Sequence, residues 1–249
     1  MHSEKLKKLC CMALTALLAV SVCGCKASGD PAQAEAAQAA KEAQQAVENG
    51  TTAEEAAEAE TIEDLYSEAG LTPAAEDDPL WADAEFELPA IAQLLAYKAT
   101  FADTFNENDP SADDFWTVTA MGVVAIPPEN ATDPFKIVHA KEALVLDYSA
   151  ALLPSYEPGD AAPKLEDVYG ISGNPRSDII DIDSLSINVE SSIVLLGTDE
   201  KNGTTIMRVH IEDKEGLITQ TDWDVLVERW GDGAEHALPL KVVQFYNVN

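Results

Sequence analysis

The C-terminal part of the chain alternates between apolar and polar residues with a period of two. This alternation is typical of strands with one buried face, because successive side chains point to opposite faces of a sheet. Asn202-Gly203 and Asp232-Gly233 lie between the runs and are typical of hairpin turns. Short loops between neighbouring strands predict an antiparallel meander. The last run is apolar on both faces, so we expect it to be central in the sheet or covered on both sides. The four runs are residues 185–195, 207–212, 222–228 and 238–248.

The segment before these strands carries apolar residues at steps of three and four, which predicts amphipathic helices. The first helix begins at Leu88, and the second is capped by Ser111 with Asp114 three residues later. A third helix is predicted over about residues 135–153 and ends at Pro154. Helices followed by a meander predict an α+β fold, with the helices packed on a curled antiparallel sheet of four or more strands.

A long acidic segment precedes the predicted domain. Residues 30–87 are rich in Ala, Glu and Gln and contain few large apolar side chains before Ile62. One candidate helix follows Asp30-Pro31, and a second runs from Thr52 to Gly70. Because so little apolar surface is available, we expect a helical or disordered stalk that adds little to the stability of the domain.

The N-terminus has the features of an export signal. Positive residues at Lys5, Lys7 and Lys8 precede an apolar run from Leu9 to Val22, which is too short to cross a membrane comfortably. The next residues, Cys23, Gly24 and Cys25, complete a stretch from Val22 that resembles the lipobox of bacterial lipoproteins. The resemblance implies a covalent lipid on Cys25, which would become the mature N-terminus and anchor the chain to a membrane.

These features divide the chain into three parts. We expect a lipoprotein signal peptide at 1–24, an acidic stalk at 25–87 and an α+β domain at 88–249. The order of elements in the last part resembles NTF2-like and cystatin-like rolls. Together with the lipobox and stalk, the chain is similar to uncharacterised surface lipoproteins of Gram-positive bacteria. The resemblance implies an extracytoplasmic location, which in a Gram-positive host is the outer face of the cytoplasmic membrane.

Charge narrows the possible partners. The chain has 45 acidic and 15 basic residues and a formal net charge of −30. Such a chain repels phosphate backbones, so nucleic acid is excluded as a partner. The four cysteines, Cys10, Cys11, Cys23 and Cys25, all lie in the N-terminal region, which leaves the domain without a disulfide framework. The remaining partners are the membrane, reached through the lipid, and a surface protein, cell-wall protein or small ligand.

Several side chains are candidates for catalysis. NTF2-like enzymes place a carboxylate, His or Tyr in an apolar pocket as general acid or base. The candidates here are Asp147 and Tyr148, together with His139 on the predicted third helix and His210 on a strand. His210 shares its sheet face with other polar residues, so a solvated face with cross-strand charge pairs is the competing interpretation. This face carries Arg208, Glu190, Glu212, Asp222 and Asp224.

The candidates for metal and ligand binding are few. Asp178, Asp181 and Asp183 cluster before the first long strand, and Asp199-Glu200 lies in a hairpin, but neither group has the spacing of a calcium loop. No metal or cofactor other than the lipid is therefore expected. Aromatic residues on the strands more often belong to the core, and Trp230 beside Gly231 is the one we expect to be partly exposed. Trp230 and Arg208 are the binding candidates.

The sequence therefore predicts a lipid-anchored protein that presents a small α+β binding or interaction domain, with the ligand undefined. The alternative is an NTF2-like pocket enzyme of the isomerase or dehydratase type. A deep cavity containing Asp147, Tyr148 or His210 would favour the enzyme, and a filled interior would favour binding.

Overall fold

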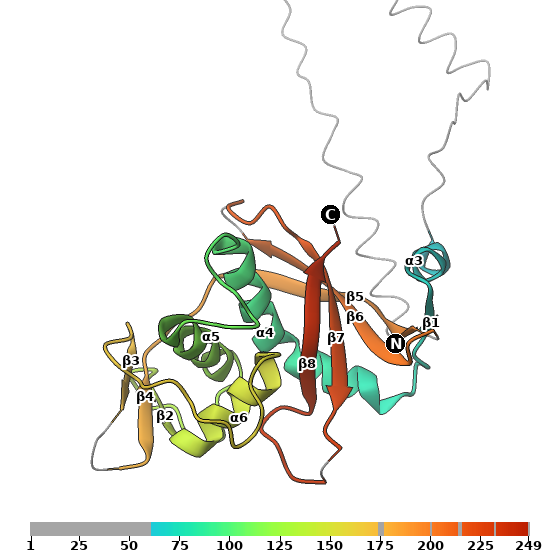
Figure 1. Ribbon diagram of the computed structural model, residues 1–249. Coiled ribbons are helices and arrows are strands. Elements are labelled where there is room, and N and C mark those ends of the chain that lie inside the picture. Colours follow the sequence, from blue (N-terminus) through green and yellow to red (C-terminus); the bar gives the residue numbers. More distant parts are fainter. Residues whose placement is uncertain (1–60, 174–176, 200, 214–215, 232, 249) are drawn as a thin grey trace, which may run out of the picture. The chain divides into compact units, whose positions relative to one another are not determined.

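The main element of the fold is a five-stranded antiparallel sheet (Figure 1). The computed structural model describes residues 61–248 except 174–176, 200, 214–215 and 232. The strand order is β1-β5-β6-β7-β8, so the predicted meander is confirmed and extended by one strand. The strands are β1 (Leu71–Pro73), β5 (Val189–Asp199), β6 (Thr204–Asp213), β7 (Asp222–Arg229) and β8 (Leu240–Asn247).

Strand β8 lies at an edge of this sheet, and the expectation of a central or doubly covered strand was wrong. Leu240, Val242 and Phe245 face the helices, whereas Val243 and Tyr246 are exposed. A register shift between Leu226 and Val227 changes which β8 residues face inward, because an extra residue reverses the alternation. The apolar residues of β8 are thus divided between the core and the solvent.

Helices α4 (Pro79–Thr100) and α6 (Glu142–Leu152) contact one face of the sheet, and α5 (Ala112–Ala125) packs beside them. Helix α4 contacts β5, β6 and β8, and α5 packs against α4 and α6. The inward residues Met207, Val209 and Val225 are fully buried beneath them. Each such apolar side chain contributes about 1.5 to 3 kcal/mol to folding. The α+β class is therefore as predicted.

Helices α5 and α6 approach each other closely. A Cβ added at Gly122 of α5 would collide with Cδ1 of Leu152 on α6, so the Leu152 side chain would have to shift to make room. Thr119 and Ser149 form a buried hydrogen bond between the same helices, with their hydroxyl oxygens 2.9 Å apart. Each hydroxyl supplies the other with a hydrogen-bond partner, so these two polar residues can be buried between the helices.

The opposite face of the sheet is partly covered by α3 (Ile62–Ala69), which ends at the left-handed Gly70 as the sequence predicted. It begins after the N-cap Thr61, whose extended backbone interrupts the helix expected from Thr52. Tyr66 packs against Leu195, and its hydroxyl donates to the Leu196 carbonyl at 3.1 Å and accepts from the Leu196 N–H at 3.0 Å. Strand β1 then pairs with β5, where an added Cβ at Gly197 would lie 2.5 Å from the Thr72 carbonyl oxygen.

The folded unit therefore begins well before the expected boundary at residue 88, which falls inside α4. Helix α4 begins at Pro79, after the N-cap Asp78. The few apolar residues of the predicted stalk are concentrated between residues 62 and 87, where they pack on the sheet and the helices. The expected signal peptide and most of the expected stalk, including the candidate helix after Asp30, lie outside the described residues.

A second, three-stranded sheet has the order β2-β4-β3 and consists of β2 (Val138–Lys141), β3 (Ile171–Gly173) and β4 (Ile179–Ile182). It replaces the first turns of the predicted third helix. Lys136 has a left-handed φ of 65°, which a helix does not accommodate, and Val138 and Ala140 then alternate into the core. His139 therefore lies on a strand and not on a helix.

Candidate functional site

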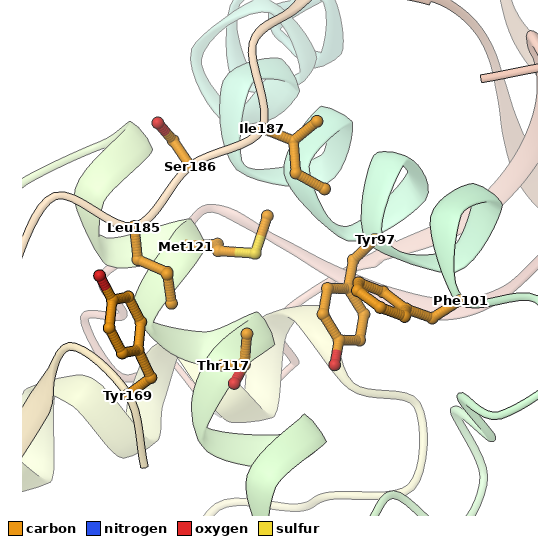
Figure 2. A pocket seen from close by; sticks show the side chains of 8 residues that line it. All are labelled: Tyr97, Phe101, Thr117, Met121, Tyr169, Leu185, Ser186 and Ile187. Carbon is orange, nitrogen blue, oxygen red and sulfur yellow. The ribbon is translucent and has the colours of Figure 1, made fainter. Parts of the chain in front are cut away.

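A cleft of about 320 Å³ lies between α4, α5 and the chain that leads into β5 (Figure 2). We call it the aromatic cleft. Tyr97 and Phe101 stand together on one side, and Tyr169 stands on the other, with Met121 between them. Tyr169 is 87% exposed and Phe101 is 44% exposed. The lining residues are Tyr97, Phe101, Thr117, Met121, Tyr169, Leu185, Ser186 and Ile187.

The chemistry of this lining is apolar and hydroxylic. None of the eight residues is an Asp, Glu, His, Lys, Arg or Cys. The Tyr97 hydroxyl donates to Asp114 Oδ1 at 2.6 Å. Burial, assisted by the hydrogen bond to Asp114 and by the nearby negative charges, raises the pKa of Tyr97 well above its ordinary value. Tyr97 therefore stays protonated at physiological pH and offers a ring and a committed hydroxyl rather than a proton acceptor.

The walls of the aromatic cleft are fixed by side chains behind them. Gln93 of α4 donates to the Ile187 carbonyl at 2.9 Å and accepts from the Ile187 N–H at 2.7 Å. The Trp116 indole of α5 donates to the Pro163 carbonyl at 3.0 Å, which holds the segment that leads to Tyr169. The Tyr97 and Phe101 rings lie one helical turn apart, with centroids separated by 4.6 Å. The cleft is thus largely formed before any ligand arrives.

Two residues singled out from the sequence, Asp147 and Trp230, meet at the other end of the helices through His236. Asp147 Oδ1 lies 2.7 Å from His236 Nδ1, and Asp147 Oδ2 accepts from the Ala237 N–H at 2.5 Å. The Trp230 ring stacks on His236 with centroids 3.8 Å apart, and its indole donates to the Leu238 carbonyl at 2.8 Å. These contacts hold the β7–β8 loop (residues 230–239) against α6.

Tyr148, the third candidate of this region, is buried in the core. Its hydroxyl donates to the Ile126 carbonyl at 2.5 Å. Burial raises the pKa of Tyr148 to about 12, with a further contribution from the charges of Asp147 and Glu87. Asp147, Tyr148 and Trp230 do not line the aromatic cleft. Their polar atoms bind other parts of the protein, so the geometry gives them a structural use.

Glu87 of α4 belongs to the same region and was not singled out from the sequence. Its side chain is fully buried, and Oε2 accepts from the Leu240 N–H at 2.8 Å. Among the described residues, its other oxygen, Oε1, has no hydrogen-bond partner. Burial raises the pKa of Glu87 well above its ordinary value, and the charge of Asp83 adds to the shift. Glu87 therefore joins α4 to the start of β8 through this buried hydrogen bond.

Arg208 and His210, both on β6, lie on the outer face of the sheet, and the predicted cross-strand pairs are present there. Arg208 binds Asp224 through two hydrogen bonds of 2.7 and 2.9 Å, and this pair raises the pKa of Arg208. His210 Nδ1 lies 2.9 Å from Asp222 Oδ1. Bidentate pairing uses the guanidinium, so Arg208 has little capacity left to bind a ligand.

The remaining acidic candidates form no cation site in the described residues. Asp181 pairs with His139, whose Nδ1 lies 2.7 Å from Asp181 Oδ1, and hydrogen bonds to Asp181 and Asp133 raise the pKa of His139. Asp183 accepts from the Ser184 N–H. In the part of the chain that the structure describes, no three Asp, Glu, His or Cys side chains are arranged to hold a metal. Glu200 lies outside the described residues.

The lipobox residues Val22, Cys23, Gly24 and Cys25 also lie outside the described residues, so lipidation stays a prediction. None of the helices between residues 61 and 248 combines the length and the apolar character that crossing a membrane would need. No protein-family model, curated protein or solved structure matches this chain. The function must therefore be inferred from the chain itself.

The aromatic cleft has no signature in the sequence because its residues come from four separate segments. Phe101 is the C-cap residue of α4, and it is 44% exposed. Tyr169 has no periodic apolar neighbours. An aromatic residue beside Gly170 and outside any periodic run is the one sequence signal that could have drawn attention to it.

Proposed function

We propose that this protein is a lipid-anchored, extracytoplasmic lipoprotein whose folded unit binds a small ligand in the aromatic cleft. The observation that carries the binding proposal is the pair of exposed aromatic rings, Phe101 and Tyr169, on opposite sides of an apolar hollow. Exposed aromatic side chains that converge on a preformed concave surface are typical of binding sites.

The composition of the lining favours binding over acid–base catalysis. A general acid or base needs a pKa near the operating pH and an open path to the substrate. The aromatic cleft offers only hydroxyls of Tyr, Thr and Ser. The candidates with suitable chemistry, Asp147 and His210, are paired with other side chains elsewhere in the unit. We therefore favour the binding interpretation over the NTF2-like enzyme.

The anchoring proposal rests on the N-terminal sequence. Basic residues, an apolar run and a cysteine follow one another in the order that lipoprotein export requires. A lipid on Cys25 would supply the membrane affinity, because each buried methylene contributes about 0.8 kcal/mol. The folded unit would then meet ligands at an outer membrane surface.

Replacing Cys25 with alanine tests the anchor. The Cys25→Ala variant should lose labelling by palmitate and should either appear in the medium or accumulate unprocessed. A Cys11→Ala variant is the matched control, because Cys11 lies within the expected signal peptide. Equal labelling of the Cys25→Ala variant and the wild type would contradict the proposal.

Filling the aromatic cleft tests the binding site. Ser186 lines the cleft and is exposed, so a Ser186→Trp variant should fill it without disturbing the core. Ser192→Trp is the matched control, because Ser192 is exposed on strand β5 and does not line the cleft. The neutral dye Nile red should bind to the wild type and the control, and much more weakly to Ser186→Trp. Equal binding to all three would contradict the proposal.

A further inference from the structure

The aromatic cleft has an electrostatic character that its own lining does not show. Asp113 and Asp114 occupy the first turn of α5, and Asp113 lies four residues before the lining residue Thr117. Residues four apart lie on the same face of a helix. Asp114 accepts the hydroxyl of Tyr97 at 2.6 Å. Two carboxylates therefore stand next to an apolar hollow that carries no charged residue of its own.

Two lysines, Lys98 and Lys164, are engaged with other groups. Lys98, which lies between Tyr97 and Phe101 in the sequence, contacts Glu107 at 2.8 Å and the Phe105 carbonyl at 2.9 Å. Lys164 pairs with Glu166. The residues that line the cleft include no Lys or Arg that could pair with the two carboxylates of α5. The negative charges of Asp113 and Asp114 reach Tyr97, where they contribute to its raised pKa.

Aromatic rings and negative charge select the same kind of ligand. The face of an aromatic ring attracts a cation through its quadrupole, by about 0.5 to 2 kcal/mol. The protein already uses this contact once in this region, because Lys98 Nζ lies 5.7 Å from the centre of the Phe105 ring. An anionic ligand, in contrast, would meet the two carboxylates and a chain with a net charge of −30.

We propose that the ligand of the aromatic cleft is a small organic cation, an ammonium ion with alkyl or aryl groups. Its apolar groups would contact Met121, Leu185 and Ile187, and its nitrogen would lie among the aromatic rings on the side of Asp113. The volume of about 320 Å³ is at the lower end of the range of small-molecule sites, about 300 to 1,000 Å³, which favours a free molecule over an extended peptide. This inference rests on the proposed binding function.

Three probes of similar size separate charge from shape. Calorimetric titration of the full chain with benzyltrimethylammonium, benzyl alcohol and phenylacetate compares a cation, a neutral molecule and an anion. The cation should bind at least about tenfold more tightly than phenylacetate, with benzyl alcohol between them. Its affinity should fall as the screening length decreases from about 30 Å in 10 mM salt to about 3 Å in 1 M salt.

Substitutions test which residues produce the preference for a cation. Phe101→Leu keeps the apolar contact but removes the ring. It should lower the affinity for benzyltrimethylammonium by about fivefold and the affinity for benzyl alcohol much less. Asp113→Asn should lower the affinity for benzyltrimethylammonium by about threefold. Phe135→Leu and Glu228→Gln are the matched controls, because both residues are exposed and do not line the cleft.

The possible failures are distinguishable. If benzyl alcohol binds as tightly as the cation and Ser186→Trp abolishes both, the cation preference is overturned and the binding function stands. If no probe binds, or if Ser186→Trp leaves their binding unchanged, the binding function is overturned as well. A lysine-containing peptide that displaces the cation at much lower concentration would overturn the assignment to a free small molecule.

Discussion

The two ends of helix α4 use their polar groups in different ways. Near the N-terminal end, Asp83 pairs with Arg229 at 2.7 Å, and Glu87 accepts from the Leu240 N–H at 2.8 Å. Near the C-terminal end, Tyr97 and Phe101 turn their rings toward the open aromatic cleft. The N-terminal end is tied to β7 and to β8 by hydrogen bonds, and the C-terminal end presents the exposed Phe101 ring to solvent.

This difference shows where chemical function is available. Titratable side chains look like catalytic groups in a sequence, but near the N-terminal end of α4 Asp83 is paired with Arg229 and Glu87 is bound to the Leu240 N–H. A group that already has a well-formed hydrogen bond loses that bond when it takes a ligand instead. The cleft at the other end has few such commitments, so its surface remains available to a ligand.

Removing the N-terminal end of α4, together with α3 and β1 before it, should have the largest effect on stability. We compare a chain that starts at residue 88 with one that starts at residue 61. Only the shorter chain lacks Tyr66, Leu71, Ala84 and Glu87, all of which are buried. Burial of Tyr66 and Leu71 alone contributes about 3 to 6 kcal/mol, which is comparable with the whole stability of a domain.

We therefore expect a cooperative urea transition, followed by circular dichroism, for the chain that starts at 61, and no cooperative transition for the chain that starts at 88. This expectation replaces the one drawn from the sequence, in which residues up to 87 add little to stability. Equal transition midpoints for the two chains would restore the sequence-based boundary.

The sequence predicted the regular elements well and the connections between them poorly. The strands of the meander and helix α5 carry a clear period and a cap at Ser111, and these are local signals. Strand β1 has only three residues, too few for any period, and it forms because Gly197 of β5 allows a close approach. Long-range contacts such as Asp147 with His236, 89 residues apart, have no local signature.

The same limit applies to the candidate site. Asp147, Tyr148, Trp230 and Arg208 were chosen for their chemistry, and the structure shows that their polar atoms bind other parts of the chain. Whether a polar group is satisfied depends on the tertiary fold and cannot be read from composition. The aromatic cleft was missed for the converse reason, because its residues have unremarkable chemistry and become a site only through proximity.

A smaller effect on stability should follow from replacing Glu87, near the N-terminal end of α4, with glutamine. Burial raises the pKa of Glu87 above its ordinary value of 4.5, so the folded protein retains a proton that the unfolded chain releases. Stability from this group is therefore greatest below about pH 4.5 and falls as the pH rises toward the folded pKa, by about 1.4 kcal/mol per pH unit. Glu87→Gln cannot titrate and should escape this loss.

Urea unfolding at pH 4.5 and at pH 7.5 measures the effect. The difference in unfolding free energy between Glu87→Gln and the wild type should shift in favour of the variant at the higher pH. Glu85→Gln is the matched control, because Glu85 is exposed on the same helix. A difference that does not change with pH would show that Glu87 is ionised in the folded state.

The smallest effect on stability should come from the other end, at Tyr169. Its side chain is 87% exposed, so a Tyr169→Ser variant loses little buried surface, and the unfolding free energy should change by less than about 0.5 kcal/mol. Binding of benzyltrimethylammonium should nevertheless weaken several-fold, because one of the rings around the cation is gone. Thermal unfolding and calorimetric titration of the same preparation measure the two quantities together. A large loss of stability would mean that Tyr169 supports the fold, and the comparison between a committed end and an available end of α4 would no longer hold.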